Sequence, residues 1–185
     1  KYGGQYIHHV YTPSTVVVES GDVAFDIDEP SKLNAHEGAL YIQDEFEATD
    51  RLLINAGLRL TTFAQVGAYS EYLYDEQGES TGTREYAAGE RVADYYALEP
   101  RISARYTLGR TSSVKASFNR GQQYVHLASF STTTLPTDVW IPSGKNVKPL
   151  IGTQYAAGYF RDFAERMFET SVEVYYKDMQ NLLEY

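Results

Sequence analysis

The chain has 185 residues, of which 43% are hydrophobic and 22% are charged, so it is long enough for one domain with a sizeable core and its composition does not indicate disorder. The formal net charge of −9, without any basic cluster, argues against nucleic-acid binding. Cysteine is absent, which excludes disulfide scaffolds, thiolate metal sites and cysteine nucleophiles. Tyrosine is abundant, with 17 residues against 8 Phe, and its ring and hydroxyl suit boundaries between apolar and wet regions.

No run of about 18 apolar residues is present, so the sequence contains no candidate transmembrane helix. A membrane barrel remains compatible with this pattern, because its strands alternate and keep the mean hydropathy low. The chain does not begin with Met and shows no signal peptide, so we expect either a mature product or an excised piece.

Period-two alternation begins in the segment 37–47, where Leu40, Ile42 and Phe46 share one face although Asp44 interrupts it. A helix over 32–53 is the competing interpretation, because the segment has good helix formers and Asn34 could cap it. We favour the strand because the segment that follows, 52–62, alternates plainly.

The same alternation continues to residue 177 in four further segments, 98–108, 113–119, 152–163 and 167–177. Each segment has one apolar and one mainly polar face. Apolar residues that should share one face of the sheet are Leu52, Ile54, Leu58, Ile102, Ala104, Val172 and Val174. Either lipid or a second layer of structure must cover them, and the sequence offers no strands for a second layer.

Short and long connections alternate along the chain. The predicted hairpins span 37–64, 95–121 and 152–178, and their tight turns lie at 48–50, 109–110 and 163–165. The predicted long loops span 11–34, 67–93 and 128–150. Because the strands are antiparallel, all short turns lie at one end and all long loops at the other, as in outer-membrane barrels. The sequence therefore predicts an all-β fold, an antiparallel up-and-down meander of about six to seven long strands that forms part of a transmembrane β-barrel.

One hairpin reads EGALYIQDEF at 37–46, followed by TDRL at 49–52 and NAGLR at 55–59. Glu99-Pro100-Arg101, SVKAS at 113–117 and the segment 154–159 follow in order. These segments resemble TonB-dependent outer-membrane receptors, and the loop segment 138–142 is similar to that of members from Bacteroidetes-type bacteria. The resemblance covers about residues 35–185, and its specificity lies in the order and spacing of the motifs.

The resemblance implies the C-terminal part of a barrel of about 22 strands, in the bacterial outer membrane, that imports a nutrient actively. It also implies the partners: outer-membrane lipid, the remaining strands and plug of the same receptor, and TonB, which contacts an N-terminal part. We find neither plug nor coupling motif here and expect residues 1–185 to be a fragment of one barrel domain. The substrate, an iron chelate, an oligosaccharide or another small molecule, stays open. The alternative is a soluble β-sheet binding module or adhesin that uses its Tyr-rich loops.

No catalytic motif appears, so we expect no enzyme activity, no cofactor and no metal site. Adjacent His8 and His9 point to opposite faces of a strand and therefore cannot chelate one metal together. The acidic stretch 22–29 does not fit a calcium-loop pattern. Polar residues expected to form ladders facing the barrel lumen are Arg59, Glu99, Arg101, Arg105 and Glu173.

The candidates for ligand contact are aromatic residues on or beside the long loops, where rings could stack on a sugar or an iron chelate. They are Tyr69, Tyr72, Tyr74, Tyr124 and Trp140. The competing interpretation assigns them to an aromatic girdle or to packing within the loops.

Overall fold

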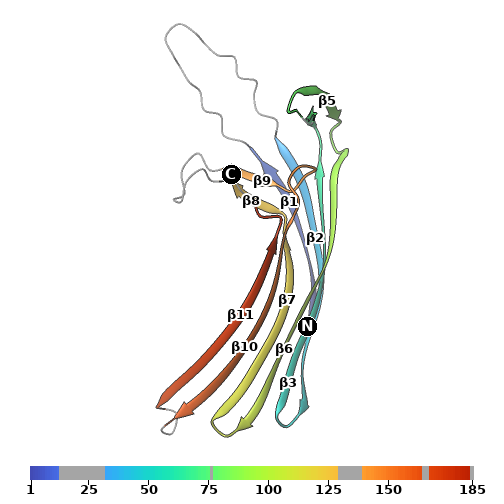
Figure 1. The fold of residues 1–185 in the computed structure, drawn as a ribbon. Coiled ribbons are helices and arrows are strands. Elements are labelled where there is room, and N and C mark those ends of the chain that lie inside the picture. Colours follow the sequence, from blue (N-terminus) through green and yellow to red (C-terminus); the bar gives the residue numbers. More distant parts are fainter. Residues whose placement is uncertain (13–31, 76, 129–138, 164–166, 184–185) are drawn as a thin grey trace.

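The computed structural model describes residues 1–12, 32–75, 77–128, 139–163 and 167–183. Seven long strands form one sheet (Figure 1). They are β1 (Tyr2–Tyr11), β2 (Leu33–Thr49), β3 (Leu52–Val66), β6 (Arg91–Gly109), β7 (Ser112–Gln123), β10 (Leu150–Phe163) and β11 (Phe168–Gln180). The described part of the chain contains no helix long and apolar enough to cross a membrane.

The sheet is an antiparallel meander in the order β1-β2-β3-β6-β7-β10-β11, and Figure 1 shows it as a single curved wall. Residues 50–51 and 110–111 make two-residue turns, at the same end of the wall as the pair Phe163 and Phe168, where β10 ends and β11 begins. The fold class expected from the alternation is confirmed. Segment 33–49 is a strand, so the competing helix is excluded. This strand pairs with β1 over Leu33–Ile42 and with β3 over Asn34–Thr49.

The strands run a few residues beyond the segments expected from the alternation. The predicted hairpin 37–64, for example, extends over 33–66. These extensions lie at the loop end, where apolar residues no longer alternate regularly but backbone pairing continues.

Four short strands lie at the loop end, three of them within segments that the sequence predicted only as loops. A hairpin of β4 (Tyr69–Tyr74) and β5 (Ser80–Tyr86) stands between β3 and β6. A second pair, β8 (Val125–Ala128) and β9 (Val139–Pro142), stands between β7 and β10. Both pairs lie at the end of the wall opposite the tight turns (Figure 1).

The register gives the wall an apolar outer face. One cross-strand row on it is Ala56, Ile102, Phe118, Tyr155 and Tyr176. Leu58, Ile102, Val172 and Val174 are 42%, 49%, 65% and 66% exposed, so no second layer of the described residues covers them. An apolar surface of this extent needs lipid or a partner to cover it.

The inner face is polar along most of its length. The neighbouring row on this face is Gln43, Gly57, Arg101, Asn119, Gln154 and Lys177. Because side chains alternate along each strand, a register slip of one residue would move such a row onto the apolar face. The wall is therefore a single layer with two chemically different surfaces.

Candidate functional site

A small core forms on the inner face toward the loop end. Phe63 of β3 is fully buried, and its ring stacks on that of Tyr124 at a centroid distance of 5.0 Å and an interplanar angle of 6°. Ala35 completes the buried cluster, and Tyr11 and Tyr95 pack against it. Tyr124 follows β7 directly, so the chain leaving the wall returns over its inner face and covers Phe63.

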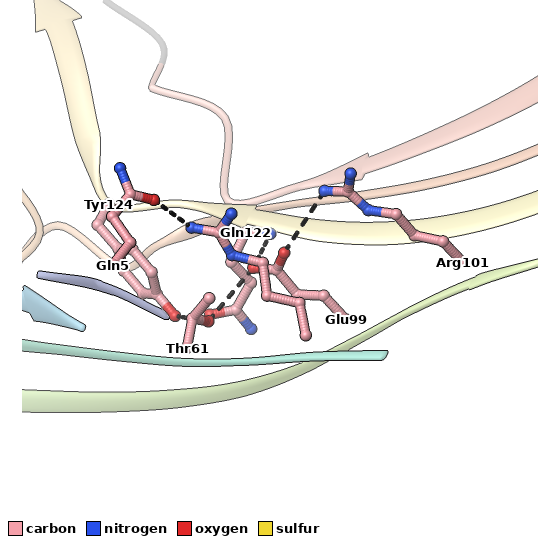
Figure 2. A network of polar contacts seen from close by, with 7 residues as sticks. Gln5, Thr61, Glu99, Arg101, Gln122 and Tyr124 are labelled. Atoms are coloured by element: carbon pink, nitrogen blue, oxygen red, sulfur yellow. Dashed lines mark hydrogen bonds and ion pairs between the residues drawn. The ribbon is translucent and has the colours of Figure 1, made fainter. Parts of the chain in front are cut away.

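A polar network lies beside this aromatic stack (Figure 2). The hydroxyls of Thr61 and Tyr124 are 2.7 Å apart, and Thr61 donates to a Glu99 carboxylate oxygen at 3.3 Å. With the Thr61 proton used in that bond, Tyr124 is the donor to Thr61. The backbone N–H of Gln122 donates to the same Glu99 oxygen at 3.2 Å, and Arg101 lies 3.9 Å from the other oxygen. Glu99 of β6 is thereby linked to the end of β7 and, through Thr61, to Tyr124.

The connection between β9 and β10 is held against the same cover. Ser143 donates its backbone N–H to the carbonyl of Tyr124 at 2.7 Å, and its hydroxyl lies 3.1 Å from Nε2 of His126. Burial lowers the pKa of His126, which favours a neutral imidazole in this contact. The Tyr95 hydroxyl donates to the carbonyl of Gly144 at 2.6 Å. The end of β7 from Gln122, where pairing with β6 has ceased, thus forms one cover together with residues 124–126 and 141–145, called here the inner cover.

One ion pair joins the inner cover to the β4–β5 hairpin. Lys145 donates to Glu71 at 2.8 Å, and the Tyr86 hydroxyl donates to the same carboxylate oxygen at 2.9 Å and also contacts the ammonium group. The hydrogen bond from Lys145 holds the pKa of Glu71 below its usual range, and the same bond raises the pKa of Lys145. The β4–β5 hairpin is therefore coupled through charged side chains to the connection that follows β9.

Two hollows lie along the wall, one beside these groups and one nearer the tight-turn end. A hollow of about 90 Å³ lies between the β4–β5 hairpin and the inner cover, lined in part by Tyr69, Glu71 and Lys145. A larger one of about 360 Å³ opens on the inner face, lined in part by Asn55, Ser103, Lys115 and Glu173. Only the second approaches the roughly 300–1,000 Å³ typical of small-molecule sites.

The structure separates the aromatic residues expected to contact a ligand. Tyr72 and Trp140 are 60% and 56% exposed at the loop end, and Tyr69 is half-buried with its ring 6.3 Å from that of Tyr86. Tyr124 is 3% exposed within the stack on Phe63, so contact with a ligand would require that stack to open. Tyr74 lies in β4, and its side chain is outside the described part of the structure.

The residues expected to form lumenal ladders lie on the inner face, but they are not equivalent. Glu99 is buried and approaches Arg101, whereas Arg59 donates to Gln5 at 3.1 Å instead of pairing with its cross-strand neighbour Glu99. Within the described ranges no carboxylate lies within 4 Å of Arg105.

Sequence reasoning missed Glu71 and Lys145, because they are 74 positions apart and neither belongs to a motif. It also missed Thr61, although its place on the polar face of an alternating strand was a usable signal. Among the described residues no group of three or more His, Cys, Asp or Glu is arranged to hold a metal ion. The acidic stretch 22–29 lies outside them.

These features define a class of protein. A curved single-layer meander with an apolar exposed outer face, a polar inner face, tight turns at one end and elaborated loops at the other is the wall of a transmembrane β-barrel. Of the two interpretations left open by the sequence, this arrangement favours the membrane barrel over a soluble binding module.

The particular family follows from comparison with known proteins. The chain belongs to the TonB-dependent receptors: the family model described as "TonB dependent receptor-like, beta-barrel" matches residues 2–185. No curated protein and no solved structure gave a significant match. The family is one of transport receptors, not enzymes, in the outer membrane of Gram-negative bacteria, which makes this chain part of an outer-membrane transport receptor.

Proposed function

We propose that this wall belongs to a receptor that captures a nutrient at the loop end and imports it actively. The observation that carries the proposal is the pair of loop-end hairpins, which present Tyr72 and Trp140 to solvent. Exposed rings on short paired strands are held in place, so little conformational entropy is lost when a ligand stacks on them. Both a sugar ring and the aromatic or apolar part of an iron chelate fit this chemistry.

The inner cover supports the proposal in a second way. It anchors the loop-end hairpins to the wall through the Phe63–Tyr124 stack and the Lys145–Glu71 pair. A capture surface needs such support, because side chains that are held by packing and hydrogen bonds present a preorganised site. We place the plug and the remaining strands of the receptor against the polar inner face and the two sheet edges, and TonB at a segment other than 1–185.

The test is growth of a strain that lacks the receptor gene. We expect the deletion to abolish growth either on one iron chelate in iron-limited medium or on one oligosaccharide as the sole carbon source. Wild-type receptor should restore growth, and the double variant Tyr72→Ala/Trp140→Ala should bind the same solute more weakly, by about 0.5–1.5 kcal/mol per stacked ring.

Tyr96→Ala is the matched control, because Tyr96 is an equally exposed aromatic that lies on the outer face of β6 and away from the loop-end hairpins. Equal growth of the deletion strain on every solute tested would contradict the proposed uptake. Full binding by the double variant would contradict only the assignment of these two rings.

A further inference from the structure

Three aromatic rings form a ladder on the outer face of β1 and β2. His8 lies directly opposite His36, and their rings stack at a centroid distance of 4.8 Å and an interplanar angle of 14°. The Tyr6 hydroxyl lies 2.7 Å from Nδ1 of His36, with the two rings 6.0 Å apart. The pairing of His8 with His36 is created by the strand register and is not a sequence motif.

The ladder lies just beyond the apolar belt of the outer face. On β2 the residues of the same face toward the tight turn are Leu40 and Ile42, both exposed. Across the sheet, the row that contains His8 and His36 continues through Ala64 of β3 to Asp94 of β6, which pairs with Arg91. The row therefore combines imidazole and charged groups at the level where a barrel leaves the hydrocarbon region. A further strand of the barrel would pair with the backbone at the edge of β1, and this pairing would not cover the outer face that carries the histidines.

Two imidazoles that face each other from opposite positions of an antiparallel pair can reach one ion, because their Cβ atoms are about 4.5–5.5 Å apart. His8 is exposed, so its ring can rotate from the stack to bring a nitrogen toward a shared ion. Tyr6 contacts Nδ1 of His36, and no other described residue makes a hydrogen bond to that ring, so Nε2 is the nitrogen that could face an ion. An oxygen partner on the second ring nitrogen is the usual outer-shell support of a metal-binding histidine, because it fixes the ring orientation.

We propose that His8 and His36 form a two-histidine site for a divalent transition metal on the outer face of the barrel, with Tyr6 as the group that orients His36. Imidazole nitrogen suits Cu²⁺, Ni²⁺ and Zn²⁺, and Cu²⁺ binds most tightly in that series. Water or an exogenous ligand fills the remaining coordination positions. Because two neutral imidazoles are required, protons compete with the metal and binding weakens in acid.

The chain supplies its own control. His9 is the sequence neighbour of His8, but it lies on the inner face, 3.0 Å from a carboxylate oxygen of Glu37 and stacked on Tyr11 at 5.7 Å. It is thus a histidine of the same strand that has a different partner and does not face His36. Removing it should leave the proposed site intact.

The experiment is titration of the complete receptor with Cu²⁺ in detergent micelles, after purification without a histidine tag. Electron paramagnetic resonance at one equivalent of Cu²⁺ should show coupling to two imidazole nitrogens. This signal should be lost in His8→Ala and in His36→Ala and retained in His9→Ala. Tyr6→Phe should keep the signal and weaken binding about tenfold, as outer-shell changes do.

His8→Gln serves as a second variant, because it keeps a polar side chain of similar size, and circular dichroism verifies the fold of each variant. Failure of the wild-type receptor to show two-nitrogen coupling would overturn the inference. So would retention of that coupling in His8→Ala or His8→Gln. The readout is metal binding and not uptake, so either result leaves the proposed capture of nutrients unaffected.

Discussion

Replacement of Phe63 by alanine tests whether the inner cover is held by the aromatic stack. Opening the cover exposes the ring of Phe63, which is now fully buried, and separates it from Tyr124. Exposure of a buried Phe side chain costs about 1.5–3 kcal/mol, and loss of the ring pair adds about 0.5–1.5 kcal/mol. In Phe63→Ala there is no ring to expose and no ring pair to separate, so neither contribution opposes the opening of the cover. Its opening free energy should therefore fall by about 2–4.5 kcal/mol.

Hydrogen exchange of backbone amides measures this opening directly. The Gln122 amide donates to Glu99 of β6, and the Ser143 amide donates to the carbonyl of Tyr124, so we expect both to exchange when the segment around Tyr124 detaches from Phe63. Since about 1.4 kcal/mol corresponds to a factor of ten, both amides should exchange roughly 30-fold to 2,000-fold faster in Phe63→Ala.

The control is Phe118→Ala. Phe118 also pairs with an aromatic ring at 5.0 Å, that of Tyr155, but on the outer face of the wall. This variant should leave the exchange of Ser143 and Gln122 unchanged. If Phe63→Ala leaves both amides as protected as in the wild type, the stack does not hold the cover and the reasoning is wrong.

Three further predictions concern the cover, the loop-end ion pair and the outer face. Tyr124→Phe removes one hydroxyl from the network and with it one hydrogen bond, worth about 1 kcal/mol net. The inner cover should therefore open about fivefold more often, and hydrogen exchange of the cover amides measures this opening. The lowered pKa of Glu71 means that its contact with Lys145 is fully formed above the ordinary carboxyl pKa and is lost only as the pH falls through the lowered value. Distances between spin labels on the two loop-end hairpins should accordingly stay short down to acidic pH in the wild type and lengthen at all pH values in Glu71→Gln. Val174→Arg on the exposed apolar face should reduce the free energy of unfolding in lipid vesicles by about 2–4 kcal/mol, whereas Tyr175→Arg on the inner face should change it little.

The wall itself could be predicted from the sequence because its signal is local. Leu58 and Arg59 are adjacent, yet one carries an apolar side chain and the other a charged one, and this contrast repeats at every step along a strand. The short turns are also encoded by neighbouring residues. The sequence therefore predicts the direction of each strand, and the end of the sheet that carries the loops, without knowledge of the strand register.

The candidate site was predictable only in part, because its contacts join distant residues. The sequence shows that His8 and His9 lie on opposite faces, but the partner of His8 depends on the register of β1 against β2. The β4–β5 hairpin was missed because residues 80–85 of β5 are exposed and mainly polar on both faces, so no apolar side marks that strand. Tyr124 was expected beside a ligand, and its burial on Phe63 arises from the return of the chain over the inner face. No local pattern encodes that return.

The central claim is that the outer face of the seven-stranded wall meets lipid and the inner face does not. This chain contains no cysteine, so once any cysteine elsewhere in the receptor is replaced, single cysteines placed at each position from 172 to 177 of β11 can carry a spin label in the complete receptor. Collision with oxygen, which concentrates in lipid, and with a water-soluble nickel chelate should alternate with a period of two residues. Labels at 172, 174 and 176 should favour oxygen, and those at 173, 175 and 177 the nickel chelate. Equal access of the nickel chelate to all six positions would mean that no membrane covers this face, and the account of the chain as a barrel wall would be wrong.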